Sequence, residues 1–481
     1  MIDEKMESYF ADWARREEVA ESMVPLIGKL YRDCGVVTTI YGRSLVHSSA
    51  IDILKAHRFA RQVIKDELCM SSSLAVLQAL SRLNLAPTRI DIGKLTTGFQ
   101  EWNAKGDVEA FLRRELAEID GGKRLPGKPQ DVVLYGFGRV GRILARILIA
   151  RSGGGDKWRL RAVVVRTGTE DDLVKRASLL RRDSIHGPFK GTIVMDPEEN
   201  AIVANGNMIR LLYSDTPEDV DYTAHGIENA IVLDNTGVWR DREGLERHLR
   251  APGVAKVVLT APGKGDVPNI VYGINNDCIV EEERILSAGS CTTNAITPVL
   301  KVVHDRYGIA SVHIETCHSY TNDQNLIDNY HRHERRGRGA PLNMVITDTG
   351  AASAVAKVLP ELEGRVTANA IRVPTPNVSL AILNLNLERE VGTEEINTYL
   401  RDISLDVPLG GQIDYTSSPE VVSSDFVGSE RAGIVDSGAT ITQGRRCVLY
   451  VWYDNEYGYS AQVIRILQHI SGLELPHFPK G

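Results

Sequence analysis

Apolar residues recur at helical spacing over roughly the first 125 residues of the chain. One such helix face holds Val108, Phe111, Leu112, Leu116 and Ile119. Gly106-Asp107 and Gly121-Gly122 bound this helix, since both pairs are turn signals. In the segment SSSLAVLQALSRLNLAP, serines precede an apolar run and a proline ends it. The pattern therefore predicts a mostly helical N-terminal domain over residues 1–126.

The pattern changes at Asp131 to short β-branched runs that alternate with helical segments. These runs are DVVLYG, LRAVVVRTG, AIVLDNTG and KVVLTAPG. Such alternation is typical of an α/β fold, a parallel sheet with helices on both faces. Beyond Cys291, runs such as VSLAILNLNLE predict a half-exposed antiparallel or mixed sheet in a further, α+β domain. The Gly-, Pro- and Lys-rich segment DGGKRLPGKPQ reads as a linker, and we place the first domain boundary near Gly127.

Composition narrows the class of protein. A chain of 481 residues needs more than one domain, and 43% apolar with 25% charged residues is ordinary for a globular protein. No apolar run approaches the ~20 residues of a membrane helix. A formal charge of -7 gives no basic surface for nucleic acid. The N-terminal stretch MIDEKMESYFADWARREEVAES is too charged for a signal peptide, and six scattered cysteines suit a reducing compartment. We therefore expect a cytoplasmic protein. We expect neither a membrane nor a nucleic acid as its partner.

A glycine-rich turn joins the first β-run to an amphipathic helix in VVLYGFGRVGRILARIL. Its residues are Gly136, Phe137, Gly138, Arg139, Val140 and Gly141. The first glycine permits the tight turn, the second lets the backbone approach a pyrophosphate, and the third lets helix and strand pack closely. The helix N-terminus offers free N–H groups to the phosphates. We therefore predict a Rossmann-type NAD(P)-binding domain over 127–290, completed by a C-terminal helix over 456–481, and a catalytic domain over 291–455.

The end of the second strand bears on cofactor choice. Folds of this kind carry an acid there, which binds the adenine ribose hydroxyls. Here the strand ends VVVRTGTEDD, with Arg166 and Thr167 at that position. A guanidinium beside a small hydroxyl suits a ribose 2′-phosphate, so we expect NADP to be favoured, or NADP and NAD both to be accepted. The alternative is a surface arginine, with Glu170 or Asp171 serving the ribose after a local shift.

Cys291 stands between a strand-like run and a helix-like run in ILSAGSCTTNAITP. A cysteine attacks as a thiolate, and a base or a helix N-terminus must lower its pKa. Ser290 to Thr293 are typical of a helix cap, and His318 ends a strand-like run in IETCHSYTNDQ. Spacing alone leaves two interpretations open for each residue: a packed or a nucleophilic cysteine, and a structural or a catalytic histidine.

Six motifs follow GFGRVGR in order: SCTTNA, HSYTNDQ, RRGRGAP, TDTGAA, RVPTPNVS and WYDNEYGYS. In this order they resemble phosphorylating glyceraldehyde-3-phosphate dehydrogenase. The resemblance covers roughly residues 130–475, so the N-terminal helical domain is an extension outside it. It implies reversible conversion of glyceraldehyde 3-phosphate and inorganic phosphate to 1,3-bisphosphoglycerate with NAD or NADP, through a cysteine hemithioacetal and a thioester, in a homotetramer.

The resemblance also implies roles for individual residues. Cys291 is the nucleophile; His318 is the base that holds it as thiolate and, with the Cys291 backbone N–H, meets the oxyanion. Asn455 orients the nicotinamide carboxamide. The residues implied for the two phosphate sites are Thr321, Arg372 and Asp323 for the substrate phosphate, with Asp323 alternatively orienting Arg372, and Ser290, Thr292, Thr349, Gly350 and Arg336 for the attacking phosphate. The cofactor contacts implied beyond the glycine-rich turn are Thr236, Gly237 and Thr260.

Other functions remain open at this point. Erythrose-4-phosphate dehydrogenase shares the cysteine, the histidine and the cofactor turn but hydrolyses its thioester; that family lacks the threonines and glycine present here as Thr321, Thr349 and Gly350. A non-catalytic regulatory or scaffold protein on the same fold is the other alternative, and a partner of the N-terminal domain is unknown. His331 and His333 have the HxH spacing of a zinc site but no third ligand nearby, so we predict no metal and expect this segment to cross a subunit contact.

Overall fold

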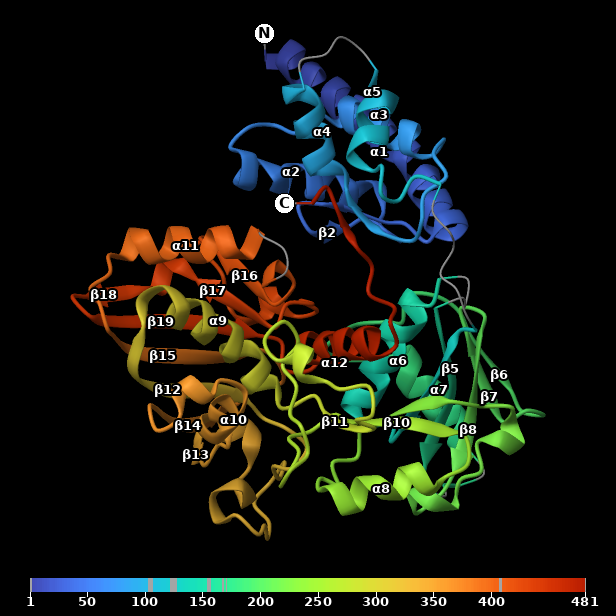
Figure 1. Ribbon diagram of the computed structural model, residues 1–481, viewed down its shortest axis with the longest axis vertical. Coiled ribbons are helices and arrows are strands. Elements are labelled where there is room, and N and C mark those ends of the chain that lie inside the picture. The colour runs from blue at the N-terminus through green and yellow to red at the C-terminus, as the bar shows by residue number, and fades with distance from the viewer. Residues whose placement is uncertain are drawn as a thin grey trace. The chain divides into compact units, whose positions relative to one another are not determined.

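The computed structural model describes residues 2–102, 107–121, 128–153, 157–166, 168–169, 171–405 and 409–480 (Figure 1). The chain divides into two compact units. Unit 1 comprises Met1–Lys128 and Leu473–Gly481, and unit 2 comprises Pro129–Gly472. The predicted boundary residue, Gly127, lies outside the described residues. No helix in the described part of the chain is long and apolar enough to cross a membrane.

Unit 1 is mostly helical, as the spacing of apolar residues predicts. Its helices are α1 (Ile2–Cys34), α2 (Ala50–Ile64), α3 (Met70–Leu80), α4 (Ile92–Glu101) and α5 (Val108–Glu115). The last of these ends sooner than the pattern predicts, although Leu116 and Ile119 are still buried. A small sheet of order β2-β1-β3-β20 accompanies the helices, with strands β1 (Val37–Ile40), β2 (Arg43–Ser44), β3 (Arg89–Asp91) and β20 (His477–Phe478).

The end of the chain belongs to unit 1. Strand β20 pairs in parallel with β3, and the backbone N–H of Arg89 and the hydroxyl of Thr88 both donate to the Pro476 carbonyl at 2.8 Å. Phe478 is buried in the core of unit 1. The prediction that residues 456–481 form one helix of the dinucleotide domain is therefore wrong for its last part. Helix α12 (Tyr457–Ile470) ends early because Gly472, with φ of +62°, turns the chain out of the helix.

We expect the Phe478→Ala variant to destabilise unit 1 by about 3 kcal/mol, the low end for a buried phenylalanine, because a chain end can partly adjust to the cavity. Denaturant unfolding followed by amide exchange in β3 would measure the loss. A Lys480→Ala variant is the control, because its side chain is exposed. Its ammonium makes a surface ion pair with Glu118 and lies 5.8 Å from the centre of the Phe478 ring, contacts that contribute little to stability. Equal stability of the two variants would contradict the packing role of Phe478.

The first sheet of unit 2 has the order β11-β10-β9-β4-β5-β8-β7-β6. Its strands are β4 (Gln130–Tyr135), β5 (Trp158–Val165), β6 (Ile193–Asp196), β7 (Ala201–Ala204), β8 (Asn207–Tyr213), β9 (Ala230–Asp234), β10 (Val254–Leu259) and β11 (Ile285–Ser287). Six of them pair in parallel, and in chain order these run 3-2-1-4-5-6 across the sheet. This is the Rossmann order, so the predicted α/β fold is confirmed.

Helices connect and cover this sheet: α6 (Arg139–Arg151), α7 (Asp172–Arg181) and α8 (Arg242–Arg250). Helix α12 packs against α6, so a C-terminal helix does complete this part of the fold. Parallel strands place their carboxyl ends at one edge of a sheet, and the order of strands reverses between β4 and β9. Ligands of such sheets bind at this edge, near the reversal.

The second sheet of unit 2 is mixed, as predicted. Its order is β13-β14-β12-β15-β19-β17-β16, with β18 also paired to β19. The strands are β12 (Ile309–Ser319), β13 (Val345–Thr347), β14 (Val366–Val373), β15 (Ser379–Leu387), β16 (Ile413–Thr416), β17 (Gly433–Asp436), β18 (Ile441–Gln443) and β19 (Arg446–Tyr453). Three helices accompany them: α9 (Cys291–Tyr307), α10 (Ala351–Val358) and α11 (Thr393–Leu405). Apolar residues of α9, β12, β15 and β19 form the core.

Candidate active site

The glycine-rich turn lies between β4 and α6 and fits a dinucleotide. Gly136 has φ of +96°, and an added Cβ would lie 3.1 Å from Thr236 Cγ2. A Cβ on Gly141 would lie 2.5 Å from the Gly136 carbonyl oxygen, so only glycine allows this helix to approach the strand. Gly138 caps α6, and a Cβ there would meet nothing within 4 Å. The open side of the turn, with Arg139 and Val140 opening the helix, is where a pyrophosphate would bind.

The Arg139 side chain belongs to a charge network rather than to this open side. Its guanidinium donates to Asp183 Oδ2 at 2.6 Å and to Glu456 Oε1 at 2.9 Å. His186 Nε2 lies 2.9 Å from Glu456 Oε2. The hydrogen bond that Arg139 donates to Glu456 raises the pKa of Arg139. The network joins the start of α6 to the start of α12, so it fixes the turn, and only the Arg139 backbone is free to meet a phosphate.

The other predicted cofactor residues follow β9 and β10 at the same sheet edge. Asp234 ends β9, and its Oδ1 accepts hydrogen bonds from the Thr236 N–H and hydroxyl, both at 2.7 Å. Gly237 follows with φ of +63°. Thr260, after β10, donates to the Asp234 carbonyl at 3.0 Å. These contacts hold the two loops beside the glycine-rich turn, as the implied cofactor roles require.

Arg166 directly follows β5 and is exposed. Thr167 and Glu170 lie outside the described residues. Asp171 is also exposed, and Asp172 is buried and accepts from Arg176 at 2.6 Å. The Asp172 carboxylate, close to the end of β5, is therefore already paired with Arg176 of its own helix.

Cys291 and His318 come together although 27 residues separate them. Cys291 is the first residue of α9, whose cap is Ser290: its hydroxyl accepts from the Thr293 N–H at 3.0 Å. His318 is the penultimate residue of β12 and is buried. Its Nε2 lies 3.5 Å from Cys291 Sγ. Its Nδ1 lies 2.7 Å from the Ser319 carbonyl oxygen, which can only accept, and 2.8 Å from an Arg372 nitrogen, which can only donate. With the proton on Nδ1, Nε2 can accept one from the thiol.

Arg372 lies beside this pair because of strand register. Strands β12 and β14 pair in parallel with His318 opposite Arg372. One guanidinium nitrogen lies 2.8 Å from His318 Nδ1 and donates to the Ser319 carbonyl at 3.0 Å. The buried Nε of Arg372 has no hydrogen-bond partner in the described part of the chain. A buried, unpaired donor is costly, so an anionic ligand at this position would satisfy it.

Burial and Arg372 together set the charges of the pair. Burial raises the pKa of the Cys291 thiol, and the Arg372 charge and hydrogen bonds only partly lower it. Burial and then the Arg372 charge lower the pKa of His318 to about 3. These pKa directions favour a thiol and a neutral imidazole in the resting pair, because the nearby guanidinium opposes an imidazolium. A thiolate held by His318 stays a prediction.

We expect alkylation of Cys291 in the cofactor-free protein to accelerate about tenfold per pH unit between pH 6 and 8, since only the thiolate reacts and its fraction rises with pH below the thiol pKa. Mass spectrometry of the Cys291 peptide after timed iodoacetamide treatment would measure the rate. The exposed Cys69 of the same sample serves as the internal reference. A Cys291 rate that stays constant over this range would instead indicate a thiolate–imidazolium pair.

Two hydroxyls around Cys291 are already engaged. Thr292 is buried, and its hydroxyl lies 3.0 Å from the Tyr453 hydroxyl. The Ser290 hydroxyl lies 2.7 Å from the Thr293 hydroxyl. Sequence reasoning did not single out Tyr453, although it lies within the WYDNEYG motif. Its position explains why a threonine follows the cysteine: the hydroxyl ties the start of α9 to the end of β19.

The remaining predicted phosphate residues form a network next to Arg372. Asp323 accepts hydrogen bonds from Thr321 and from Arg336, the latter at 2.6 Å. Arg336 also donates to Thr347 at 2.9 Å. Burial alone would raise the pKa of Asp323, but Thr321, Arg372 and Arg336 lower it. Asp323 therefore contacts Arg336 directly and affects Arg372 through its charge.

The other two phosphate residues lie at the start of α10. Gly350 caps that helix and is exposed, and the Thr349 hydroxyl accepts from the Ala351 N–H at 3.2 Å. Asn455 is buried, and its side-chain oxygen accepts from the Ser379 hydroxyl at 2.9 Å. This bond directs the amide, and Ser379 is a positioning residue that the sequence motifs did not reveal.

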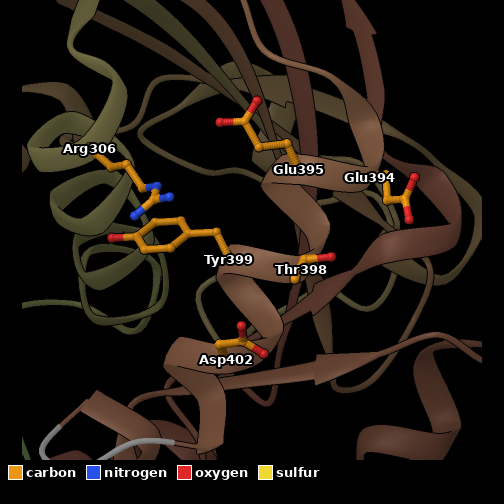
Figure 2. A pocket seen from close by; sticks show the side chains of 6 residues that line it. All are labelled: Arg306, Glu394, Glu395, Thr398, Tyr399 and Asp402. Carbon is orange, nitrogen blue, oxygen red and sulfur yellow. The ribbon is translucent and has the colours of Figure 1, made fainter.

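The predicted site is distinct from a surface hollow of about 480 Å³ on α11 (Figure 2). Its lining residues are Arg306, Glu394, Glu395, Thr398, Tyr399 and Asp402. The Arg306 guanidinium lies 4.7 Å from the centre of the Tyr399 ring, as Figure 2 shows. Three carboxylates around one arginine do not suit a phosphorylated substrate. No group of three or more metal-ligating side chains occurs in the described parts of the chain, the surroundings of His331 and His333 included.

Comparisons with known proteins agree with this geometry. The glyceraldehyde 3-phosphate dehydrogenase NAD binding domain matches residues 130–242, and the C-terminal domain of the same enzyme matches residues 290–455. A glyceraldehyde-3-phosphate dehydrogenase-like protein of Pseudomonas aeruginosa is 58% identical over 461 residues, which cover 95% of this chain and 100% of that protein. Most of unit 1 is thus included in that match.

Other relatives match a smaller part of the chain. Glyceraldehyde-3-phosphate dehydrogenase 2 of Trichormus variabilis is 39% identical over 342 residues, 71% of this chain and 98% of its own. The chloroplastic glyceraldehyde-3-phosphate dehydrogenase A of Zea mays is 40% identical over 358 residues, 74% of this chain and 86% of its own. The chain therefore belongs to the glyceraldehyde-3-phosphate dehydrogenase family of NAD(P)-dependent oxidoreductases.

Proposed function

We propose that this protein oxidises and phosphorylates glyceraldehyde 3-phosphate to 1,3-bisphosphoglycerate, reversibly, with NAD or NADP. The observation that carries the proposal is the 3.5 Å approach of Cys291 Sγ to His318 Nε2 at the start of α9. This geometry suits a thiol that gives its proton to an imidazole as it adds to an aldehyde. Arg372 provides a cation beside both groups.

The residues act in a definite order in this proposal. Cys291 Sγ adds to the aldehyde carbon while His318 Nε2 takes the thiol proton. The Cys291 N–H, at the helix start, and the protonated His318 stabilise the oxyanion. His318 donates this proton to the oxyanion, which gives the hemithioacetal hydroxyl. His318 then takes the hydroxyl proton back, and a bound nicotinamide, oriented by Asn455, would accept the hydride. The resulting thioester is attacked by inorganic phosphate, which releases the acyl phosphate and restores Cys291.

Two phosphate sites serve this sequence. Arg372 and Thr321 bind the phosphate of the substrate, and the unpaired Arg372 Nε supports this assignment. The attacking phosphate binds to the residues around the start of α9 and α10, namely Ser290, Thr292, Thr349, Gly350 and Arg336. Several of these donors must exchange their present partners for phosphate, since Arg336 now donates to Asp323 and Thr347.

The present hydrogen bonds of Arg336 and Thr292 favour a second candidate function, that of an erythrose-4-phosphate dehydrogenase, which hydrolyses its thioester. If Arg336 and Thr292 keep their present bonds, the attacking-phosphate site is incomplete and water attacks instead. The decisive assay measures turnover of glyceraldehyde 3-phosphate with and without inorganic phosphate. Dependence on phosphate supports our proposal, whereas undiminished turnover without phosphate supports hydrolysis. An inactive wild-type protein that still binds cofactor would favour a regulatory role.

The cofactor preference rests on Arg166, which is exposed at the end of β5. Its guanidinium suits the 2′-phosphate of NADP. We expect kcat/KM to be higher with NADP than with NAD, and the Arg166→Ala variant to lose at least about tenfold with NADP only, as expected for one charge-assisted contact. The control is Arg159→Ala on the same strand. A several-fold preference of the wild type for NAD would contradict this assignment.

We also propose a cytoplasmic homotetramer. The catalytic thiol must stay reduced, which suits the cytoplasm, and all six cysteines are free. Large apolar side chains are exposed on the segment that contains the HxH pair, at Leu326, Ile327, Tyr330, Leu342, Met344 and Ile346. Exposed apolar patches of this kind mark contacts between proteins. A subunit contact over this segment would bury them, and sedimentation analysis would give the number of subunits.

A further inference from the structure

The first half of α1 carries an apolar face that the described residues of the chain leave exposed. Met6, Tyr9, Phe10 and Trp13 are 49%, 67%, 64% and 48% exposed. Their spacing of three, one and three residues places all four on one side of the helix. Every residue from Met6 to Ala11 is exposed, so the described residues of the chain leave this part of the helix largely uncovered.

The same face is buried further along the helix. Ala20, Met23, Ile27 and Leu30 continue the stripe and lie in the core of unit 1. Arg16 ties the intervening turn to Glu67, which follows α2, at 2.5 Å. The exposed part of the stripe, from Met6 to Trp13, therefore extends about two turns beyond the residues that cover it. Isolated helical turns are marginally stable in water, so a contact that covers this face would stabilise the helix.

We infer that this face, defined by Met6, Tyr9, Phe10 and Trp13, binds the same face of a second copy of the chain, with the two helices antiparallel. The four positions are symmetric about the midpoint between Tyr9 and Phe10. A two-fold axis there places Met6 opposite Trp13 of the other copy, and Tyr9 opposite Phe10 of the other copy. A self-complementary patch of this kind is what a two-fold contact requires.

Charge complements this arrangement. Lys5 and Asp12 lie on the same edge of the apolar face, since they are separated by two helical turns. In the antiparallel pair each Lys5 lies about two residues, ~3 Å along the axis, from the level of Asp12 of the other copy. The Asp12 carboxylate also accepts hydrogen bonds from Arg15 and Arg16 of its own helix. Antiparallel helices also align opposite ends of their dipoles, whereas a parallel pair would stack Trp13 on Trp13 and like ends together.

The area of this face indicates a modest affinity. An aromatic side chain buries 150–250 Å² when fully covered, so four partly exposed side chains supply a few hundred Å² per copy, against ~800 Å² per partner in a stable complex. The contact therefore forms at high concentration, or where other contacts already hold two chains together. The acidic residues Glu4, Glu7 and Asp12 argue against an anionic membrane as the alternative partner.

The test traps this contact with disulfides in the full-length protein. Met6→Cys and Trp13→Cys variants are oxidised separately and as a mixture. An antiparallel pair brings residue 6 of one copy next to residue 13 of the other. Residue 6 of one copy and residue 6 of the other lie about 10 Å apart along the axis, beyond disulfide reach, and the same holds for the two residues 13. We expect a covalent dimer from the mixture, at least several-fold above either variant alone and above the oxidised wild type, which controls for Cys69 and Cys278.

A second substitution tests whether the apolar face is responsible. Phe10→Asp, added to both cysteine variants, should abolish the cross-link. Val194→Asp, which alters an apolar residue of unit 2 with similar exposure, should leave it unchanged. Equal cross-linking of each variant with itself would overturn the antiparallel pairing. Absence of any mixed dimer, or co-sedimentation of the wild type with anionic vesicles, would overturn the second copy as occupant.

Discussion

Replacement of Cys291 by serine is expected to lower kcat for glyceraldehyde 3-phosphate by at least about 10⁴-fold, with cofactor binding unchanged. A serine hydroxyl is a far weaker acid than a thiol. His318, whose pKa burial lowers to about 3, is too weak a base to deprotonate it. Initial rates and a fluorescence titration with NAD(P)H would measure the two quantities.

The neighbouring Cys317 supplies the control. Cys317 lies on β12 directly before His318 and is partly buried. Successive strand residues face opposite sides of the sheet, and His318 faces Cys291, so the Cys317 side chain points away from Cys291. We expect Cys317→Ser to retain kcat within about twofold. Activity that survives in Cys291→Ser would rule out the covalent mechanism, whatever the identity of the substrate.

The His318→Asn variant should lose between about 10² and 10⁴ in kcat, the range for a general acid–base group. Asparagine keeps a polar side chain in the same place but cannot take the thiol proton. The remaining rate should rise with pH up to the pKa of the Cys291 thiol, because thiolate formation then depends on solvent alone. The measurement is a pH profile of kcat with saturating substrate and cofactor.

His313→Asn is the matched control for this variant. His313 lies on the same strand and contacts Thr367 at 2.9 Å, away from Cys291. Its substitution should change neither kcat nor the pH profile. A His318→Asn enzyme with the wild-type profile would show that another group removes the thiol proton, and Tyr453, next to Thr292, would then be the first residue to examine.

Much of the dinucleotide domain is predictable because its signals are local. The glycines of the turn are fixed by the positive φ at Gly136 and by the approach of Gly141 to the Gly136 carbonyl. The alternation of β-runs with helices specifies a parallel sheet, and Ser290 marks the start of α9 through its own hydrogen bond. Each of these features depends on residues a few positions apart.

The position of Arg372 beside the catalytic pair was not predictable in this way. The β12–β14 register places the Arg372 guanidinium 2.8 Å from the His318 imidazole, which favours a neutral imidazole over the implied thiolate pair. The contact between Asp323 and Arg336 was likewise not predictable from the local sequence. These contacts follow from pairing between segments that are tens of residues apart, and their charges depend on burial that composition does not reveal.

The sequence by itself determined the helical extension, the cofactor turn and the order of the catalytic motifs, since periodicity, backbone freedom and motif residues are properties of short segments. Only the tertiary structure decided that the last strand returns to unit 1 through Phe478 and that Arg139 is bound to Asp183 and Glu456. It also decided that the face from Met6 to Trp13 stays exposed among the described residues. The physical reason is that burial and strand pairing are decided by contacts between distant residues.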